Sequence, residues 1–470
     1  MFYKNKYQIL LSNIAIFMVG NLLSKALVFL LMPFYTSILS IEHYGTSELY
    51  ISMIEIIFPI ATLSIIEALY RFSIDQNNLN ELFSNSILIV LSGSAIFALI
   101  AIIIYYTIYP YQYIKEFILL YFTFTFYALT TQFSRGLGHV KRYAMYGVFN
   151  VMLLIFTSYY FLSILKLDVI GYLLSFSLSY GFTAILAFLI SKEYKYILPF
   201  RLNICLMKEM LNYSIPSIPN MISWWINNTL NRYIILFFLG INSAGLYIAA
   251  TKLPSIINLA STIFQKAWQY SAAKEINSPQ KSLFFKNVFN TYKFICFTLC
   301  FIIISIIEPL SYFILGKNFF SAWRFIPFLL IAATLGCLST YFGSLYNALK
   351  ENKNLMLSTI YGSIIGFLLN IILIPTLGIF GASISTMLSY GSIVYFRFSD
   401  LNKRLNLCID KKTIIIEVII LAIYSVYILY YNSHRLYIVD IFLFLCIIYL
   451  NKKTLNFYFL NLLKRIKQFN

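Results

Sequence analysis

Long, uninterrupted apolar segments dominate this chain, and most are long enough to cross a lipid bilayer. A spanning helix needs about 20 apolar residues, because each residue adds ~1.5 Å and the hydrocarbon core is ~30 Å thick. Hydrophobic residues make up 60% of the 470 residues and charged residues only 11%. A soluble protein of this length would need more polar surface, and a β-barrel would show alternating rather than continuous apolar runs. The sequence therefore predicts an all-α integral membrane protein.

The pattern of apolar segments and basic loops predicts about fourteen transmembrane helices with both termini in the cytoplasm. Lys and Arg gather at the termini and in the loops after even-numbered segments, which the positive-inside rule assigns to the cytoplasm. The remaining loops are short and leave no room for an external soluble domain. The predicted spans are about 9–38, 44–71, 83–109, 114–134, 143–164, 168–191, 210–238, 243–270, 286–314, 321–348, 355–375, 378–398, 413–431 and 436–451.

The net charge of +18 belongs to the same pattern. On a soluble chain it would favour nucleic acid as a partner. Here the basic residues lie in short loops between apolar segments, so we expect contact with membrane lipids and no nucleic acid.

Two halves of the chain resemble each other weakly. Leu39–Gly45 aligns with Leu239–Gly245, and further along Leu178–Gly181 aligns with Leu388–Gly391. The matches keep the same order in both halves, although apolar segments also align easily by chance. We interpret them as an internal repeat.

Each predicted repeat holds six spans, and an even number gives both copies the same orientation in the membrane. Two parallel bundles of this kind are related by an axis along the membrane normal, with the binding site expected between them near the midplane. The sequence thus predicts an N-lobe at residues 1–200 and a C-lobe at 201–400. Two further helices and a basic tail follow at 401–470.

Three ionisable residues lie deepest in the predicted spans: Lys25, Glu55 and Lys252. Each is roughly 14–20 Å from a helix end at ~1.5 Å per residue. A charge in hydrocarbon costs several kcal/mol unless it has a partner or a water-filled cavity, so these positions indicate a polar lumen. A purely structural ion pair is the alternative.

Shallower charges extend this interpretation. Glu48 lies one heptad before Glu55, and Lys266 lies two heptads after Lys252. Arg135 lies near a cytoplasmic helix end, where snorkelling to the interface is the alternative explanation. Glu417 is predicted to be peripheral, because its span lies outside the repeat.

Span 7 carries a polar stripe. Asn220, Trp224, Asn227 (or its neighbour Asn228) and Asn231 recur at intervals of three and four residues, which places them on one helix face. Asn side chains in lipid need partners, so this face is expected to meet protein or water. Hydrogen bonding between helices, with no ligand, is the alternative.

The sequence contains no HExxH, GxSxG or Walker motif, and its three histidines are not grouped with Cys or carboxylates. We therefore expect neither an enzyme nor a metal site, and no cofactor. Energy for transport would come from a proton or sodium gradient, the membrane potential or the substrate's own gradient.

Three groups of residues form a recognisable pattern: Gly20–Lys25, Met32–Tyr35 and Tyr44-Gly45; Arg135–Gly138 and Lys141; and Asn231–Tyr233, Leu239-Gly240, Ala244–Tyr247 and Ala249–Lys252. The pattern resembles the polysaccharide-transporter branch of the multidrug/oligosaccharidyl-lipid/polysaccharide (MOP) exporter superfamily, which includes the Wzx-type O-antigen and capsule repeat-unit flippases. The resemblance covers about residues 8–400. Family members often have Asp-Arg where this chain has Asn231-Arg232, which removes a negative charge.

The resemblance implies a two-lobed, MATE-like bundle in the plasma (inner) membrane that opens alternately to each side. It implies a polyprenyl-pyrophosphate-linked oligosaccharide as substrate, and polysaccharide polymerase machinery as a partner. The anionic head group would meet cations in the lumen, while Glu48 or Glu55 would pair with a lysine or exchange a proton or sodium ion. The predicted lumen cations are Lys25, Lys252, Lys266 and Arg135, and the predicted glycan-facing residues are Asn220, Trp224, Asn227 and Asn231.

Other functions remain open at this stage. An ion-coupled drug or cation exporter of the same superfamily would favour acids over bases at the midplane. A membrane-embedded glycosyltransferase or polymerase commonly needs a sizeable external loop, and the outer loops here are short. A non-transporting scaffold would not need charges within its spans.

Overall fold

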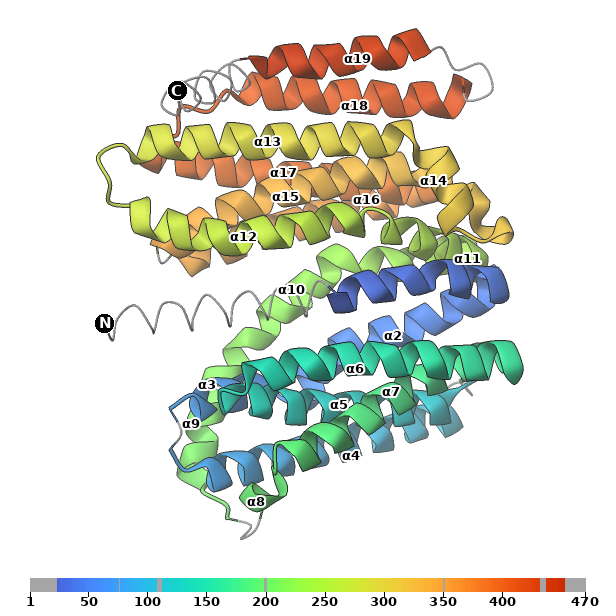
Figure 1. Cartoon of the computed structure of the whole chain (residues 1–470), viewed down its shortest axis with the longest axis vertical. Helices are drawn as coiled ribbons and strands as arrows, with labels where there is room; N and C mark the ends of the chain where they lie inside the picture. The colour runs from blue at the N-terminus through green and yellow to red at the C-terminus, as the bar shows by residue number, and fades with distance from the viewer. Residues whose placement is uncertain are drawn as a thin grey trace, which may run out of the picture. The chain divides into compact units, whose positions relative to one another are not determined.

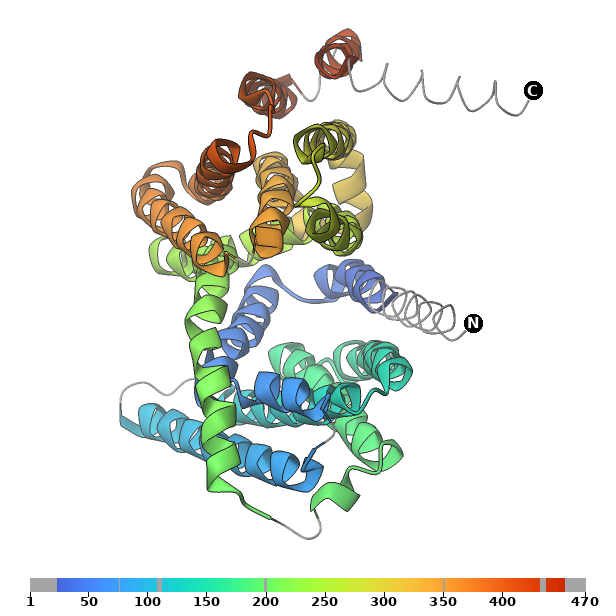
Figure 2. The ribbon, with the colours of Figure 1, turned by 90° about the vertical axis from the view of Figure 1, so that its left-hand side faces the viewer.

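The computed structural model describes residues 23–75, 77–107, 112–197, 201–349, 351–431 and 437–452, and its regular elements are all helices. The chain divides into two compact units, Met1–Thr229 (unit 1) and Leu230–Asn470 (unit 2). Figure 1 shows both units as helical bundles, and Figure 2 views many of the same helices end-on.

Unit 1 begins, within the described residues, with the helix Leu23–Ile38. The helices that follow are α2 (Ile41–Ala61), α3 (Ile65–Ser73), α4 (Leu79–Thr107), α5 (Ile114–Gly136), α6 (Val140–Ser158), the π-helix η1 (Tyr159–Ile164), α7 (Asp168–Ile190), α8 (Tyr194–Ile197), α9 (Ile204–Ser214), the 3-10 helix η2 (Ile215–Ser217) and α10 (Ile218–Asn228).

Aromatic and aliphatic side chains hold unit 1 together. Helix α5 packs along α7, and α3 packs on α4, α5 and α9. Phe83 and Phe133 stack with ring centroids 4.3 Å apart in a core that also contains Leu69 and Met210. Helix α9 thus belongs to unit 1, although the predicted lobe boundary precedes it in the sequence.

Unit 2 contains α11 (Leu230–Lys252), α12 (Ser255–Glu275), α13 (Lys281–Ser305), α14 (Ile307–Ile314), the 3-10 helix η3 (Lys317–Phe325), α15 (Ile326–Leu349), α16 (Asn352–Leu377), α17 (Ile379–Leu405), α18 (Lys411–Tyr431) and α19 (Tyr437–Leu450). Helix α15 lies at its centre and contacts α12, α13, α17 and α18. Figure 1 shows α18 and α19 side by side at one flank of this unit.

Two glycines divide helices where the sequence predicts short loops. Gly240 has φ +79° and ψ 177° and breaks α11, and Gly378 has φ +62° and separates α16 from α17. Other residues rarely adopt positive φ because their Cβ meets the backbone, so glycine permits these sharp breaks.

The GxxxG pair in α16 allows close helix packing. A Cβ at Gly362 would lie 2.2 Å from Cγ1 of Ile393, and one at Gly366 would lie 2.9 Å from Oγ of Ser389. Both neighbours belong to α17, so α16 and α17 approach each other where side chains are smallest.

Corresponding helices occur in the same order in the two units. Helices α5, α6 and α7 begin at Ile114, Val140 and Asp168, and α15, α16 and α17 begin at Ile326, Asn352 and Ile379. In each set the third helix packs against both of the others. This is the packing expected if an ancestral helix triplet was duplicated.

The helices are those of a multi-pass membrane protein, and the described residues contain ten candidate spans, or eleven if the bent pair α2 and α3 counts as one. Three of the fourteen predicted spans are not among these candidates. The first is described only from Leu23 onward, as the helix Leu23–Ile38, and α19 has only 14 residues. The seventh is divided among α9, η2, α10 and the start of α11.

Candidate functional site

A buried carboxylate lies among tyrosines in unit 1. Oη of Tyr172 donates a hydrogen bond to Oε1 of Glu48 at 2.9 Å, and the Glu48 side chain is buried. The ring of Tyr35 lies 4.7 Å from that of Tyr172, and its hydroxyl is 2.8 Å from Oγ of Ser158. We call Tyr35, Glu48, Ser158 and Tyr172 the carboxylate cluster. It joins four helical segments: Leu23–Ile38, α2, the end of α6 and α7.

The second acid of α2 has a different environment. Glu55 is exposed, and its Oε2 accepts a hydrogen bond from Oγ1 of Thr229 at 3.3 Å. One turn earlier, the backbone carbonyl of Ser52 accepts a 2.9 Å hydrogen bond from Nε1 of Trp225. These contacts bring α2 against α10. Glu48 is therefore buried inside unit 1, whereas the Glu55 side chain is exposed next to α10, the helix that carries Trp224 and Asn227.

The predicted glycan-facing stripe does not form one continuous face. Helix α10 ends at Asn228, and Asn231 lies at the start of α11. Trp224 is 48% exposed, whereas Nδ2 of Asn227 donates a hydrogen bond to the backbone carbonyl of Ser223. The side chain of Asn220 lies outside the described structure. The expectation of a single stripe through Asn231 is therefore wrong, because the helix is interrupted at Thr229.

Asn231 is the centre of a hydrogen-bonded group in unit 2. Its Nδ2 donates to Oγ1 of Thr386 at 2.7 Å and to Oη of Tyr247 at 3.2 Å. Its Oδ1 accepts from Nδ2 of Asn370 at 2.7 Å. We call Asn231, Tyr247, Asn370 and Thr386 the amide cluster. Asn231 is buried among helices, which corresponds to the interhelical alternative rather than to a glycan-facing position.

The three lysines predicted to line the lumen lie on three different helices, one in unit 1 and two in unit 2. Lys25 is exposed on the helix Leu23–Ile38, and Lys252 is half-buried at the end of α11 in the other unit. Lys266 lies on α12, but its side chain is outside the described structure. The approach of Lys252 to Lys25 and Glu55 remains a prediction, as do their roles in binding.

Arg135 is packed against aromatic rings at the end of α5. Its guanidinium carbon lies 4.2 Å from the ring centroid of Tyr70 and 5.5 Å from that of Tyr143. Stacking of this kind stabilises the cation while leaving its edge able to hydrogen-bond an anion. The neighbouring His139 precedes α6, and burial together with Arg142 lowers its pKa, so neutral pH leaves it uncharged.

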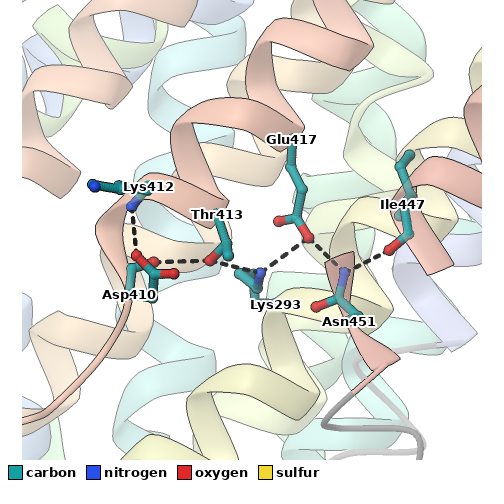
Figure 3. A network of polar contacts seen from close by, with 7 residues as sticks. All are labelled: Lys293, Asp410, Lys412, Thr413, Glu417, Ile447 and Asn451. Carbon is teal, nitrogen blue, oxygen red and sulfur yellow. Dashed lines mark hydrogen bonds and ion pairs between the residues drawn. The ribbon is translucent and has the colours of Figure 1, made fainter. Parts of the chain in front are cut away.

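Unit 2 contains a buried ion pair that the sequence analysis did not identify (Figure 3). Nζ of Lys293 on α13 lies 3.0 Å from Oε1 of Glu417 on α18, and both side chains are almost fully buried. Nδ2 of Asn451 donates to the same oxygen at 2.5 Å. The expectation that Glu417 is peripheral is therefore wrong. Opposite charges in two apolar segments were the available signal, but nothing in the sequence indicates that α13 and α18 are neighbours.

A third buried carboxyl, that of Glu193, lies outside the spans. Glu193 follows α7 in a turn and is 0% exposed, and neither carboxyl oxygen has a hydrogen-bond partner within the described residues. Burial raises the pKa of Glu193 to about 9, so the group is protonated at neutral pH.

The sequence and the fold both have known counterparts. A protein family described as "polysaccharide biosynthesis protein" matches residues 10–269. No curated protein matches the sequence.

Solved structures with the same fold come from transporters. The lipid II flippase MurJ in an inward closed conformation superposes with a TM-score of 0.69 at 12% identity, covering 96% of this chain and 100% of MurJ. An inward-facing multidrug resistance MATE family transporter of the MOP superfamily gives 0.65 at 13% identity, covering 82% and 95%. An outward-facing MATE structure gives 0.60 at 14% identity, covering 84% and 95%. At these identities the likeness establishes the fold.

Proposed function

Because this chain belongs to the polysaccharide biosynthesis protein family and has the fold of MOP superfamily transporters, we propose that it is a flippase for lipid-linked oligosaccharides. It would move polyprenyl-pyrophosphate-linked repeat units from the cytoplasmic to the outer leaflet of the plasma (inner) membrane by alternating access. The family is one of transporters, not of enzymes. The observation that carries the proposal is the family match over more than half of the chain.

The chemistry of the spans supports an anionic substrate. Lys25 and Lys252 lie within apolar segments, where a charge is costly unless water or a counter-charge is near. A pyrophosphate supplies such a counter-charge, and an ammonium group can approach it from any direction. We assign pyrophosphate contact to Lys25 and Lys252, with Lys266 and Arg135 as further cations along the path.

The acids of α2 and the polar residues of α10 take separate roles in this proposal. Glu55 is exposed beside Thr229 and is suited to pair with a lysine when the substrate is absent. Glu48 is buried under Tyr172 and is suited to exchange a proton or a sodium ion during turnover. Trp224 and Asn227 would contact the glycan, because an exposed indole stacks on sugar rings and an amide hydrogen-bonds their hydroxyls.

Gene deletion tests the proposed function. Loss of the flippase should stop surface polysaccharide assembly and leave lipid-linked repeat units in the cytoplasmic leaflet, where an impermeant glycan-modifying reagent cannot reach them. The wild-type gene should restore assembly. If the repeat units of the deletion strain were fully accessible from outside, the protein would not be the flippase for them.

Charge reversal tests the role of Lys252 separately. Lys252→Glu should fail to restore polymer in the deletion strain, because it would repel a pyrophosphate. Lys274→Glu is the matched control, since Lys274 is exposed in the last turn of α12. Unimpaired polymer assembly with Lys252→Glu would exclude this lysine from substrate binding.

The alternative from the same superfamily is an ion-coupled exporter of drugs or cations. The fold shared with MATE transporters is the observation that favours it. Such an exporter should raise resistance to cationic dyes when overproduced and should leave lipid-linked repeat units unaffected. Comparing dye resistance and repeat-unit accumulation in one deletion strain separates the two functions.

A further inference from the structure

The C-terminal helices α18 and α19 present apolar side chains on most of their surface. In α18 the only charged residue after Lys411 and Lys412 is Glu417, and in α19 the only one is Asp440. Lipid tails are as apolar as these side chains, so burial of apolar surface favours no particular helix register in a membrane. The register must come from close packing and from polar contacts between the helices.

Such a contact joins three helical segments at one point (Figure 3). Lys293 of α13 meets Glu417 of α18, and the ammonium also donates to Oγ1 of Thr413 at 3.3 Å. Asn451, directly after α19, donates to Glu417 and to the backbone carbonyl of Ile447. A single carboxylate oxygen therefore receives one donor from α13 and one from the end of α19.

A second contact lies further along the same helices and is aromatic. The rings of Phe301 and Tyr424 stack with centroids 4.4 Å apart, and the hydroxyl of Tyr424 lies 2.9 Å from Oγ of Ser305. Phe444 of α19 lies 5.4 Å from Phe301. These rings fill the interface, but they would tolerate small shifts along the helix axes better than a charged pair would.

A buried ion pair adds little net stability, because desolvation of two charges offsets their attraction. Its effect on register is different, because any shift of α18 would leave Lys293 and Glu417 buried without each other. We propose that Lys293, Glu417 and Asn451 form a docking lock that sets the register of α18 and α19 on α13. These are positioning residues, and the inference does not depend on the identity of the substrate.

Variants with and without an unpaired charge test the lock. Lys293→Met and Glu417→Leu should each lower the temperature of the thermal transition of the purified protein, because each leaves one buried charge without its partner. The double variant Lys293→Met with Glu417→Leu should recover most of that loss. Arg404→Gln is the control, since Arg404 forms ion pairs on the exposed side of the same unit and should leave the transition unchanged.

Register is measured separately from stability by photo-crosslinking. With p-benzoylphenylalanine in place of Phe444, mass spectrometry should map the crosslink to α13 around Phe301 in the otherwise wild-type protein. In the folded double variant the crosslinks should spread to positions one turn away along α13. A double variant that keeps the single crosslink site would show that the aromatic contacts alone set the register, and would overturn the proposal. If the double variant were defective in flipping but kept the single crosslink site, the defect would have a cause other than a shift in register, and this result would also count against the proposal.

Discussion

The carboxylate cluster of unit 1 and the amide cluster of unit 2 use corresponding helices but different chemistry. Tyr35 and Glu48 precede and follow the segment Leu39–Gly45, as Asn231 and Tyr247 precede and follow Leu239–Gly245. Each cluster is completed by a residue of α6 or α16 and one of α7 or α17. The same arrangement therefore holds a carboxylate in one unit and an amide in the other.

This difference separates two uses of a buried polar group. A carboxylate can take up and release a proton or bind a cation, and this is the role that we propose for Glu48. An amide does not ionise, and the amide of Asn231 hydrogen-bonds residues of three helical segments. We propose ion coupling for Glu48 in unit 1 and helix association for the amide cluster, and the following predictions test that proposal.

The largest expected effect is on transport. Glu48→Gln keeps an acceptor for Tyr172 but removes the ionisable group, so it should fold and yet lower repeat-unit flipping about tenfold or more, equivalent to at least about 1.4 kcal/mol in the barrier. The measurement is polymer assembly in the deletion strain, corrected for protein amount. Tyr172→Phe, which keeps the carboxylate, should retain more activity. If Glu48→Gln flipped repeat units at the wild-type rate, the proposed functional difference between the two clusters would be wrong.

Glu193 is a buried carboxyl that, among the described residues, has no hydrogen-bond donor comparable to Tyr172. Its pKa is about 9 when folded and about 4.5 when exposed, so the folded state binds the proton more tightly. The contribution of Glu193 to stability is therefore fully present below pH 4.5 and is lost as pH rises toward 9. At pH 7 the cost is roughly 3 kcal/mol at ~1.4 kcal/mol per pKa unit.

Glu193→Gln should remove this pH dependence. The thermal transition of the variant in detergent should exceed that of the wild type at pH 8 and approach it at pH 5. Glu209→Gln, on α9 of the same unit, is the comparison for a carboxyl that is exposed. Parallel pH profiles for Glu193→Gln and wild type would show that Glu193 ionises freely in the folded protein.

A smaller effect is expected in the amide cluster. Asn231→Leu would leave Nδ2 of Asn370 without its acceptor and would remove the donor to Tyr247 and Thr386, which should cost about 1–3 kcal/mol of stability. Asn231→Asp keeps the acceptor for Asn370 and should lose less. Thermal unfolding in detergent measures both. If Asn231→Leu matched the wild type in stability but abolished flipping, the amide cluster would be part of the transport site instead.

The smallest effect is expected at the exposed end of α17. Arg404 lies 3.0 Å from Oδ1 of Asp400, one turn away, and also pairs with Glu351. Exposed pairs of this kind contribute about 0–1 kcal/mol because water and salt screen them. Arg404→Gln should therefore leave both stability and flipping close to wild type, and a large loss would reveal a role for this surface.

Some of the site could be predicted from the sequence because the signal was local. Glu48 and Glu55 stand out as acids in an apolar segment, and Asn231 stands out as an amide in another. Their environments could not be predicted, because burial depends on which helix lies opposite. Tyr172, which covers Glu48, lies 124 residues away in the sequence. The same limit explains why the Lys293 and Glu417 pair was missed and why Glu417 was placed at the periphery.

By itself, the sequence determined the class of this protein, its helical nature and the positions at which most of its helices end. Those properties follow from the length of apolar segments and from the basic loops between them, both of which are local features of the sequence. Only the tertiary structure decided which polar groups are paired. It separated the buried Glu48 from the exposed Glu55, gathered the amide cluster and joined Lys293 to Glu417. The physical reason is that a charge or an amide in an apolar surrounding is defined by its partner, and the partners here come from distant segments of the chain.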